Sequence, residues 1–145
     1  MNRIARICVY LLIFSLLSSF ISSYAAESDS EELLPPPQRY TYLAMISASV
    51  TTSPSGAAKC AALARISSGF NNYTVSISAT LQRQTSSGWS NVKTWNKTGG
   101  SACYLEVYKG ITSGYYYRLH SVVTVYSPSG VVVESQTVNS TVVYY

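Results

Sequence analysis

From residue 39 to the C-terminus, apolar side chains alternate with serine and threonine with a period of two. The clearest case is residues 73–81, where every second residue is apolar and each residue between is serine or threonine. Successive side chains of a β-strand point to opposite faces, so this pattern is typical of strands with one buried face. Turn clusters of Gly, Pro and Ser divide the region into seven segments, and the sequence therefore predicts an all-β chain. The segments are residues 40–50, 58–66, 73–81, 89–95, 102–108, 115–126 and 131–144.

Seven short strands in about 100 residues are typical of two stacked antiparallel sheets, each with one face in water. We therefore expect a seven-stranded antiparallel immunoglobulin-like β-sandwich. The residues before the sixth segment resemble the corner that precedes strand F in fibronectin type III domains. This resemblance implies that Tyr117 is a tyrosine corner, whose hydroxyl bonds the backbone a few residues upstream. The alternative is a strand that simply begins with three tyrosines. The positions that match the corner are Ile111, Gly114, Tyr117 and Leu119.

The N-terminus has the three parts of a secretory signal peptide. Arg3 and Arg6 precede an apolar run at residues 7–21, and small residues then lead to a cleavage site after Ala25. A retained membrane anchor is the alternative, but the run is shorter than the about 20 residues that span a bilayer. Residues 26–38 hold four of the six acidic residues and three consecutive prolines. We expect a signal peptide at residues 1–25, an acidic Pro-rich flexible linker at 26–38 and one domain at 39–145.

Charge is sparse and unevenly placed. Only 11 % of the chain is charged, which argues against a disordered chain, a coiled coil or a nucleic-acid-binding tail. Residues 39–145 carry eight Lys or Arg against two Glu, a net charge of +6. The favoured interpretation of this charge distribution is an acidic, solvated tail that aids export and solubility. The alternative is that the basic domain contacts an anionic polymer of a cell envelope. We expect no nucleic-acid partner, and membrane contact only transiently through the signal peptide.

Several short segments resemble a family of small secreted proteins from Gram-positive, often gut-dwelling bacteria. Members of that family have a signal peptide, a short linker and one immunoglobulin-like domain that opens with an Arg-Tyr-Thr-Tyr type segment. The resemblance spans about three quarters of the chain and implies an exported or cell-surface domain, but it implies no activity. The matching segments are residues 39–42, 56–60, 81–83, 89–95 and 117–119.

Two cysteines remain after removal of the signal peptide, Cys60 on the second expected strand and Cys103 on the fifth. These strands are neighbours in one sheet of the expected sandwich, and both cysteines fall on plausible core faces. In an exported protein we expect them to form a disulfide. It would close a loop of 43 residues and stabilise the fold by about 4 kcal/mol or less. The alternative is two buried free thiols.

Few residues support acid–base, nucleophilic or metal chemistry. His120 is the only histidine, and the domain's only carboxylates are Glu106 and Glu134. The two glutamates are expected on different sheets, too far apart for the about 5–10 Å of a glycosidase pair. A His120–Glu134 contact is geometrically possible, but it would lie on a flat exposed face without an oxyanion hole, where a surface polar pair is the favoured interpretation. Two cysteines and one histidine are too few for a four-ligand zinc site. We therefore expect that the protein is not an enzyme and that it binds neither a cofactor nor a metal ion.

Aromatic residues are the candidate ligand contacts. Trp89 and Trp95 are six residues apart, so a regular strand would place both on one face, opposite a core-facing Val92. They would then be spaced to stack on sugar rings or a partner protein, whereas a bulge would turn one of them into the core. Tyr116 and Tyr126 are further candidates. We expect a secreted, non-catalytic module for adhesion to, or recognition of, a cell-envelope glycan or protein. The alternatives are a structural component that self-associates through edge strands, or a small secreted effector.

Overall fold

The computed structural model describes residues 40–145, and these residues form two antiparallel β-sheets. The smaller sheet has the strand order β1-β2-β5, with β1 at Leu43–Thr52, β2 at Ala57–Ile66 and β5 at Ala102–Gly110. The predicted signal peptide (residues 1–25) and linker (26–38) lie outside the described residues.

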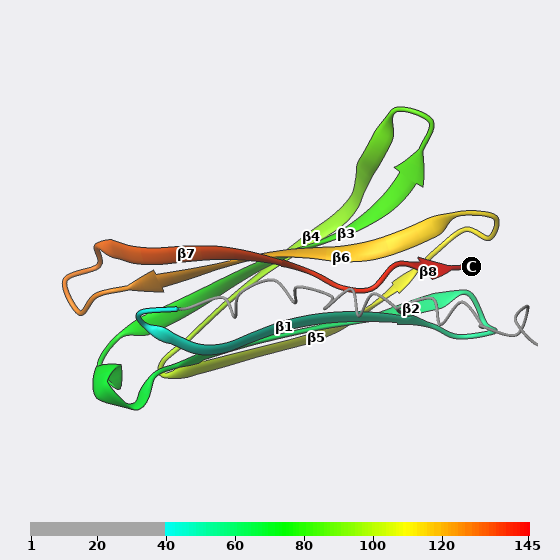
Figure 1. Cartoon of the computed structure of the whole chain (residues 1–145). Helices are drawn as coiled ribbons and strands as arrows, with labels where there is room; N and C mark the ends of the chain where they lie inside the picture. Colours follow the sequence, from blue (N-terminus) through cyan, green and yellow to red (C-terminus); the bar gives the residue numbers. More distant parts are fainter. Residues whose placement is uncertain (1–39) are drawn as a thin grey trace, which may run out of the picture. The chain divides into compact units, whose positions relative to one another are not determined.

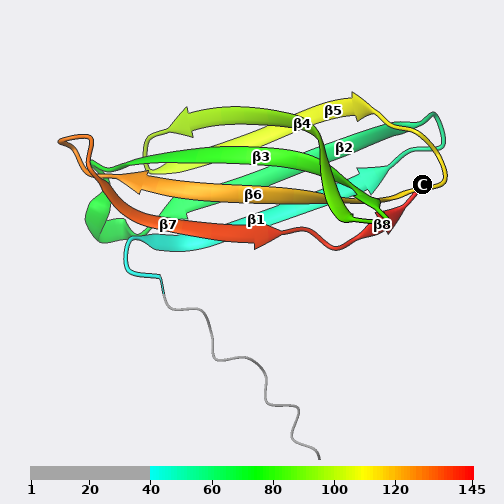
Figure 2. The same cartoon turned by 90° about the horizontal axis from the view of Figure 1, so that it is seen from above.

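The larger sheet has the strand order β4-β3-β6-β7. Its strands are β3 (Thr74–Thr85), β4 (Gly88–Gly99), β6 (Tyr116–Tyr126) and β7 (Val132–Asn139). The short strand β8 (Val143–Tyr144) also pairs with β6, and a 3-10 turn at Ser68–Phe70 precedes β3. The two sheets lie face to face as two layers, and the end of the β3–β4 hairpin rises away from the smaller sheet (Figures 1 and 2).

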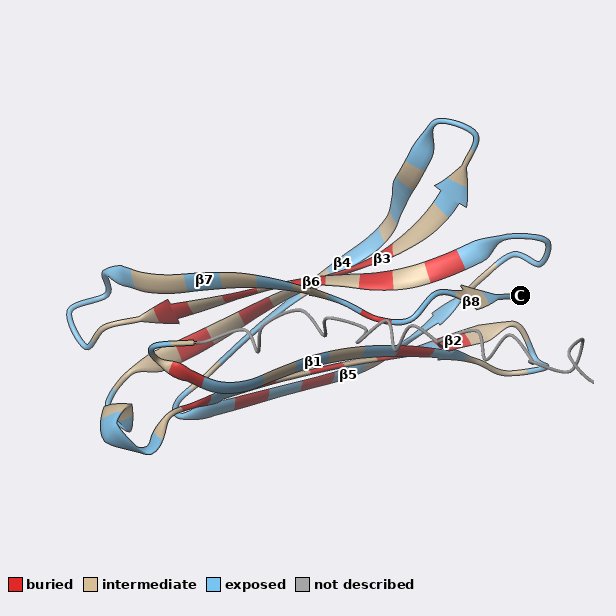
Figure 3. Cartoon of the chain, in the orientation of Figure 1, coloured by how far each residue is buried: buried red, intermediate tan, exposed pale blue. Residues whose placement is uncertain are grey.

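The period-two pattern of the sequence becomes the buried layer between the sheets. Buried residues alternate with more exposed ones along the strands, which is visible as red bands in Figure 3. Each strand thus contributes one row of side chains to a shared core, as the alternation predicted. The fully buried row on β3 consists of Val75, Ile77, Ala79 and Leu81.

The core combines small side chains of β2 with large ones of the larger sheet. Four of the five inward residues of β2 are small, three alanines and one cysteine, whereas β3 and β6 contribute branched residues such as Ile77, Leu81 and Leu119. Small residues facing large ones let the layers interdigitate at the density of a protein interior. The inward residues of β2 are Ala58, Cys60, Ala62, Ala64 and Ile66.

The last predicted strand is divided in the structure. The pairing of β6 passes from β7 to β8, and Ser140 lies between the two. The Ser140 backbone N–H donates to the Leu119 carbonyl (2.9 Å), and its hydroxyl accepts from the Leu119 N–H (2.8 Å). The same hydroxyl donates to the carbonyl of Thr141. A side chain thus replaces a backbone group in the ladder, which ends one strand and allows the next to begin.

Tyr117 makes the hydrogen bonds that its place in the corner predicted. Its side chain is buried, with 1 % exposed. The hydroxyl donates to the carbonyl of Thr112 (2.8 Å) and accepts from the Thr112 N–H (3.2 Å). Both backbone groups of Thr112 are therefore satisfied by one side chain, which fixes the loop before β6 against the core.

The predicted disulfide between Cys60 and Cys103 is wrong: both cysteines are free and buried. Their strands are neighbours, as expected, but Cys60 pairs with Val107 and Cys103 pairs with Ala64. The two cysteines are therefore four residues apart along the ladder, about 13 Å. A disulfide requires Cα atoms within about 7 Å of each other.

Candidate functional site

The two tryptophans of β4 lie on opposite faces of the larger sheet. The pairing of β3 with β4 shifts at Val92, which is the extra residue of a β-bulge. Trp95 pairs with the fully buried Ala79 and packs against the core. Trp89, beyond the bulge, pairs with Gln84 on the outer face. Of the two arrangements that the sequence left open, the structure has the bulged one, so Trp95 is not a ligand contact on the outer face.

Both candidate tyrosines of β6 lie on the outer face of the larger sheet, but at opposite ends of the strand. Tyr116 is half exposed and its ring is tilted against Tyr144, with 5.0 Å between the ring centroids. Tyr126 lies ten residues farther along β6, about 33 Å away. The structure therefore brings Trp89 and Tyr116 to the same end of this face and leaves Tyr126 at the other.

The outer face of the larger sheet is almost free of charge. By the cross-strand register it carries hydroxyl and amide side chains from β3, β4 and β7. Among the described residues on this face, Arg118 is the only Lys, Arg, Asp or Glu. Such a surface offers many hydrogen-bonding groups and one fixed positive charge. The hydroxyls and amides include Ser76, Ser78, Thr80, Thr94, Asn96, Thr98, Ser135, Thr137 and Asn139.

Arg118 is held in one orientation by Trp89 and Gln82. Its guanidinium carbon lies 4.3 Å from the centroid of the Trp89 ring, and its Nε donates to Gln82 Oε1 (2.8 Å). Gln82 Nε2 in turn donates to Asn91 Oδ1 (2.9 Å). Cation–π stacking and hydrogen bonding together fix the plane of the guanidinium. The terminal nitrogens of Arg118 make no hydrogen bond or ion pair within residues 40–145.

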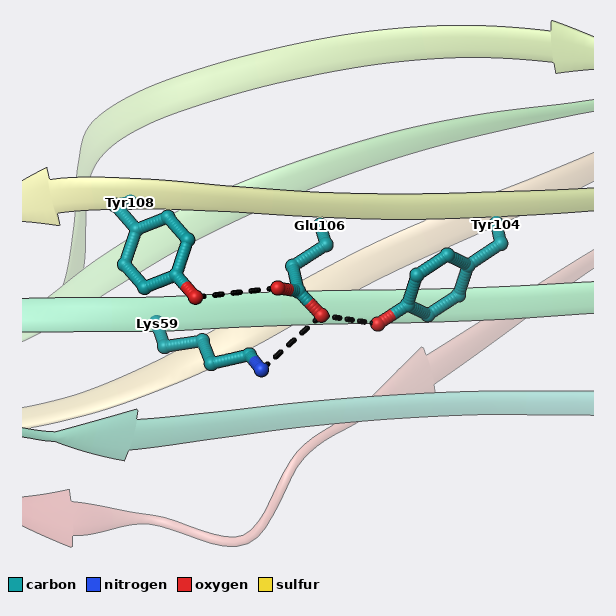
Figure 4. A network of polar contacts seen from close by, with 4 residues as sticks. All are labelled: Lys59, Tyr104, Glu106 and Tyr108. Carbon is teal, nitrogen blue, oxygen red and sulfur yellow. Dashed lines mark hydrogen bonds and ion pairs between the residues drawn. The ribbon is translucent and has the colours of Figure 1, made fainter.

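A second charged cluster lies on the outer face of the smaller sheet, where Figure 4 shows three side chains converging on Glu106. Tyr108 donates to Glu106 Oε1 (3.1 Å), and Tyr104 donates to Oε2. The ammonium of Lys59 lies 3.1 Å from Oε2, the only ion pair among the described residues. We call these four residues the Glu106 network.

The pKa shifts of Glu106, Tyr104 and Lys59 agree with one another. Hydrogen bonds from Tyr104 first, and then from Lys59, lower the pKa of Glu106 below its ordinary value. The hydrogen bond to Glu106 raises the pKa of Tyr104, and the one between Lys59 and Glu106 raises the pKa of Lys59. At neutral pH the carboxylate is therefore charged, and Tyr104 and Lys59 keep their protons. The network neutralises its own charges and leaves no charge open to a ligand.

The His120–Glu134 contact considered from the sequence is not made. His120 Nδ1 lies 2.8 Å from Asn139 Oδ1 on the outer face. Glu134 serves the backbone instead: its Oε2 accepts from the N–H groups of Tyr42 (2.7 Å) and Leu43 (3.2 Å). This carboxylate ties β7 to the start of β1, so it joins the two sheets rather than pairing with a base.

Two surface hollows border the smaller sheet. One of about 210 Å³ lies beside Lys59 and Tyr108, and one of about 500 Å³ lies beside Arg65 and Asn71. No carboxylate or histidine lines either hollow, so neither offers a pair of groups for acid–base chemistry. Within residues 40–145, no group of three or more His, Cys, Asp or Glu could hold a metal ion.

The sequence analysis missed Arg118 and its partners Gln82 and Asn91. The alternation around Tyr117 was sufficient to place Arg118 on the outer face. However, its neighbours come from β3 and β4, and the bulge at Val92 decides which of their residues share that face. No local sequence signal reports such pairing.

A comparison with protein-family models found no match for this chain, and a search of curated proteins also found none.

Proposed function

We propose that the chain is an exported, non-catalytic recognition module of immunoglobulin-like type that binds a cell-envelope glycan. The binding surface is the end of the larger sheet's outer face around Trp89, Tyr116 and Arg118. One observation carries the proposal: Arg118 is held rigidly on Trp89, and its terminal nitrogens are unpaired among the described residues. A side chain fixed in this way loses little entropy when it binds a ligand.

The chemistry of this face fits a sugar polymer. Sugars combine apolar ring faces with many hydroxyls, and aromatic rings beside amide and hydroxyl groups complement both features. Trp89 and the half-exposed Tyr116 supply the rings. The neighbouring pairs Gln82–Asn91 and Thr80–Thr94 supply ordered polar groups. An open sheet face suits an extended chain better than a small compact ligand, which prefers an enclosed pocket.

The immunoglobulin-like assignment rests on the order and packing of the strands. A three-stranded sheet packs against a sheet of four long strands and the short β8. This arrangement, together with the hydrogen-bonded hydroxyl of Tyr117 at the start of β6, supports an immunoglobulin-like sandwich of the fibronectin type III kind. The absence of catalysis is supported by the occupation of Glu134 by backbone N–H groups and of Glu106 by its own network.

Export rests on the N-terminal sequence, with its two arginines, apolar run and small residues before Ala26. The resemblance to secreted proteins of Gram-positive bacteria supports the same location. Within the described part of the chain, no helix is long and apolar enough to cross a bilayer.

The test is binding of the purified protein to an array of cell-envelope glycans. We expect at least one glycan to bind, and Trp89→Leu to weaken its binding about tenfold or more through loss of stacking. Tyr108→Leu is the matched control, because it removes an exposed ring from the other sheet and should leave binding unchanged. Absence of any binding, or equal losses in both variants, would contradict the proposed surface.

A second candidate function is self-association into a structural assembly. The observation that favours it is the edge strand β5, which pairs with β2 over nine residues without a register shift. Edge strand β4, by contrast, has a bulge and two lysines, the usual protections against edge pairing. Sedimentation of the protein over a range of concentrations tests this candidate, and a monomer at every concentration would exclude it.

A further inference from the structure

The polar chain on the outer face of the larger sheet presents donors rather than acceptors. In the sequence of bonds from Arg118 through Gln82 to Asn91, each side-chain oxygen already accepts one hydrogen bond. The groups left over at the two ends are the terminal nitrogens of Arg118 and the amide nitrogen of Asn91, which only donate. A ligand that supplies acceptors is therefore the best match to the unused nitrogens at the two ends.

The electrostatics of the same end favour a negative ligand. Arg83 follows Gln82 on β3, and its guanidinium carbon lies 4.4 Å from the centroid of the Tyr115 ring. Its Nε is buried and has no hydrogen-bond partner. No carboxylate within residues 40–145 pairs with Arg83 or Arg118, because the only ion pair there is Lys59–Glu106. Arg83 pairs with the buried Tyr117, so it leaves β3 on the face opposite to Arg118. Both guanidinium groups nevertheless lie near one end of the β3–β6 pair and add to the positive potential there.

We infer that Arg118 selects an acidic glycan, whose sugar carboxylate binds the two terminal nitrogens of Arg118 while a sugar ring stacks on Tyr116 or Trp89. This inference rests on the proposed function and names the class of glycan. A planar carboxylate matches the planar fork of a guanidinium and accepts two parallel hydrogen bonds from it. Tyr116 lies two residues from Arg118 on the same face, about 7 Å along the strand. An extended sugar chain that lies along this face can therefore contact both residues.

The experiment compares two forms of one polymer, polygalacturonate and its fully methyl-esterified form, by titration calorimetry with the purified protein. Esterification removes the negative charge and keeps the sugar backbone. We expect the acid form to bind about tenfold or more tightly than the ester, as a charge-assisted bidentate pair requires. This comparison needs no variant, so it does not depend on whether a substituted protein folds.

Two variants test the role of the fork. Arg118→Lys keeps the positive charge but loses the planar fork and the stacking on Trp89, so it should lose most of the preference for the acid form. Lys109→Gln is the matched control, because it removes one positive charge from β5 in the other sheet and should change affinity less than about twofold. Circular dichroism of each variant confirms that the β-structure is kept.

The possible outcomes separate the inference from the proposed function. Equal binding of the acid and ester forms overturns the inference but leaves glycan recognition intact. Equal binding of polyglutamate or polyphosphate also overturns it, because charge alone would then be sufficient. Full preference for the acid form in Arg118→Lys excludes the fork as its cause. If no glycan binds in a manner that depends on Trp89, the proposed function itself fails.

Discussion

Glu106 and Arg118 are two surface charges whose surroundings differ. Glu106 receives hydrogen bonds from two tyrosines and an ion pair from Lys59, so its charge is matched within the smaller sheet. Arg118 is fixed just as firmly by Trp89 and Gln82, but neither neighbour carries a negative charge. A fixed and unmatched charge is available to a ligand, whereas a matched one must first be released from its partners. This contrast is the reason for placing the binding surface on the larger sheet.

The Glu106 network gives a pH prediction. Tyr104→Phe removes the largest cause of the lowered pKa of Glu106, so this pKa should rise toward the ordinary value of about 4.3. Because the folded-state pKa is lowered, the network stabilises the fold above the ordinary pKa and loses this effect as pH falls through the folded value. In the variant, that loss should begin at higher pH.

Titration of the Glu106 side-chain carboxyl carbon by nuclear magnetic resonance measures this shift. Tyr108→Phe is the control, since the Tyr108 hydrogen bond ranks lower among the causes and its loss should move the pKa less. An unchanged pKa of Glu106 in Tyr104→Phe would contradict the network.

The cysteines give a prediction of reactivity. Cys60 is fully buried, and burial raises the pKa of its thiol to about 11; burial also raises the pKa of Cys103. The reactive species is the thiolate, so iodoacetamide at about pH 8 should modify neither residue in the folded protein. After unfolding in guanidinium without reductant, peptide mass analysis should find both residues modified. If modification required a reductant, the two thiols would be joined in a disulfide after all.

At the level of elements, the bulge at Val92 has the largest consequence for the candidate site. The alternation of the sequence predicts a strand here, but it assumes one pairing partner per residue. Because Val92 is an extra residue, the alternation of inward and outward side chains shifts by one position at the bulge. Trp95 therefore packs against the core, whereas Trp89 lies on the outer face. Bulges depend on packing against neighbouring strands, and for this reason the sequence left both arrangements open.

The corner before β6 gives a stability prediction. Tyr117→Phe removes the hydroxyl that serves both backbone groups of Thr112 and leaves them unsatisfied at the edge of the core. The free energy of unfolding should fall by about 1–3 kcal/mol, as measured by chemical denaturation. Tyr115→Phe is the matched control: its hydroxyl makes no hydrogen bond within the described residues, and the change should cost less than about 0.5 kcal/mol. Equal losses in both variants would show that the corner adds nothing.

For the whole molecule, the sequence predicted what depends on local periodicity and missed what depends on register. Alternation gave seven strand segments and their buried faces, including the inward row from Val75 to Leu81. The topology of the expected sandwich also placed the strands of Cys60 and Cys103 side by side, as the structure has them. The offset of four residues between these cysteines comes from how β2 and β5 align, and this is set by packing across the whole sandwich.

The shared core also makes a prediction about cooperativity. The small inward residues of β2 lie in the same buried cluster as Ile77 and Leu119 of the larger sheet. A three-stranded sheet gains most of its stability from such packing, so the smaller sheet should not remain folded without the larger one. We therefore expect a single two-state unfolding transition.

Two signals with different origins test this expectation. Both tryptophans of the described chain lie on β4, so their fluorescence reports on the larger sheet alone. Exposure of the Cys60 thiol to a fast thiol reagent reports on β2 in the smaller sheet. If one core holds both sheets, the two signals should change at the same denaturant concentration, together with the far-ultraviolet circular dichroism. Earlier exposure of Cys60 would mean that the smaller sheet separates first, and the two outer faces would then belong to independently unfolding layers.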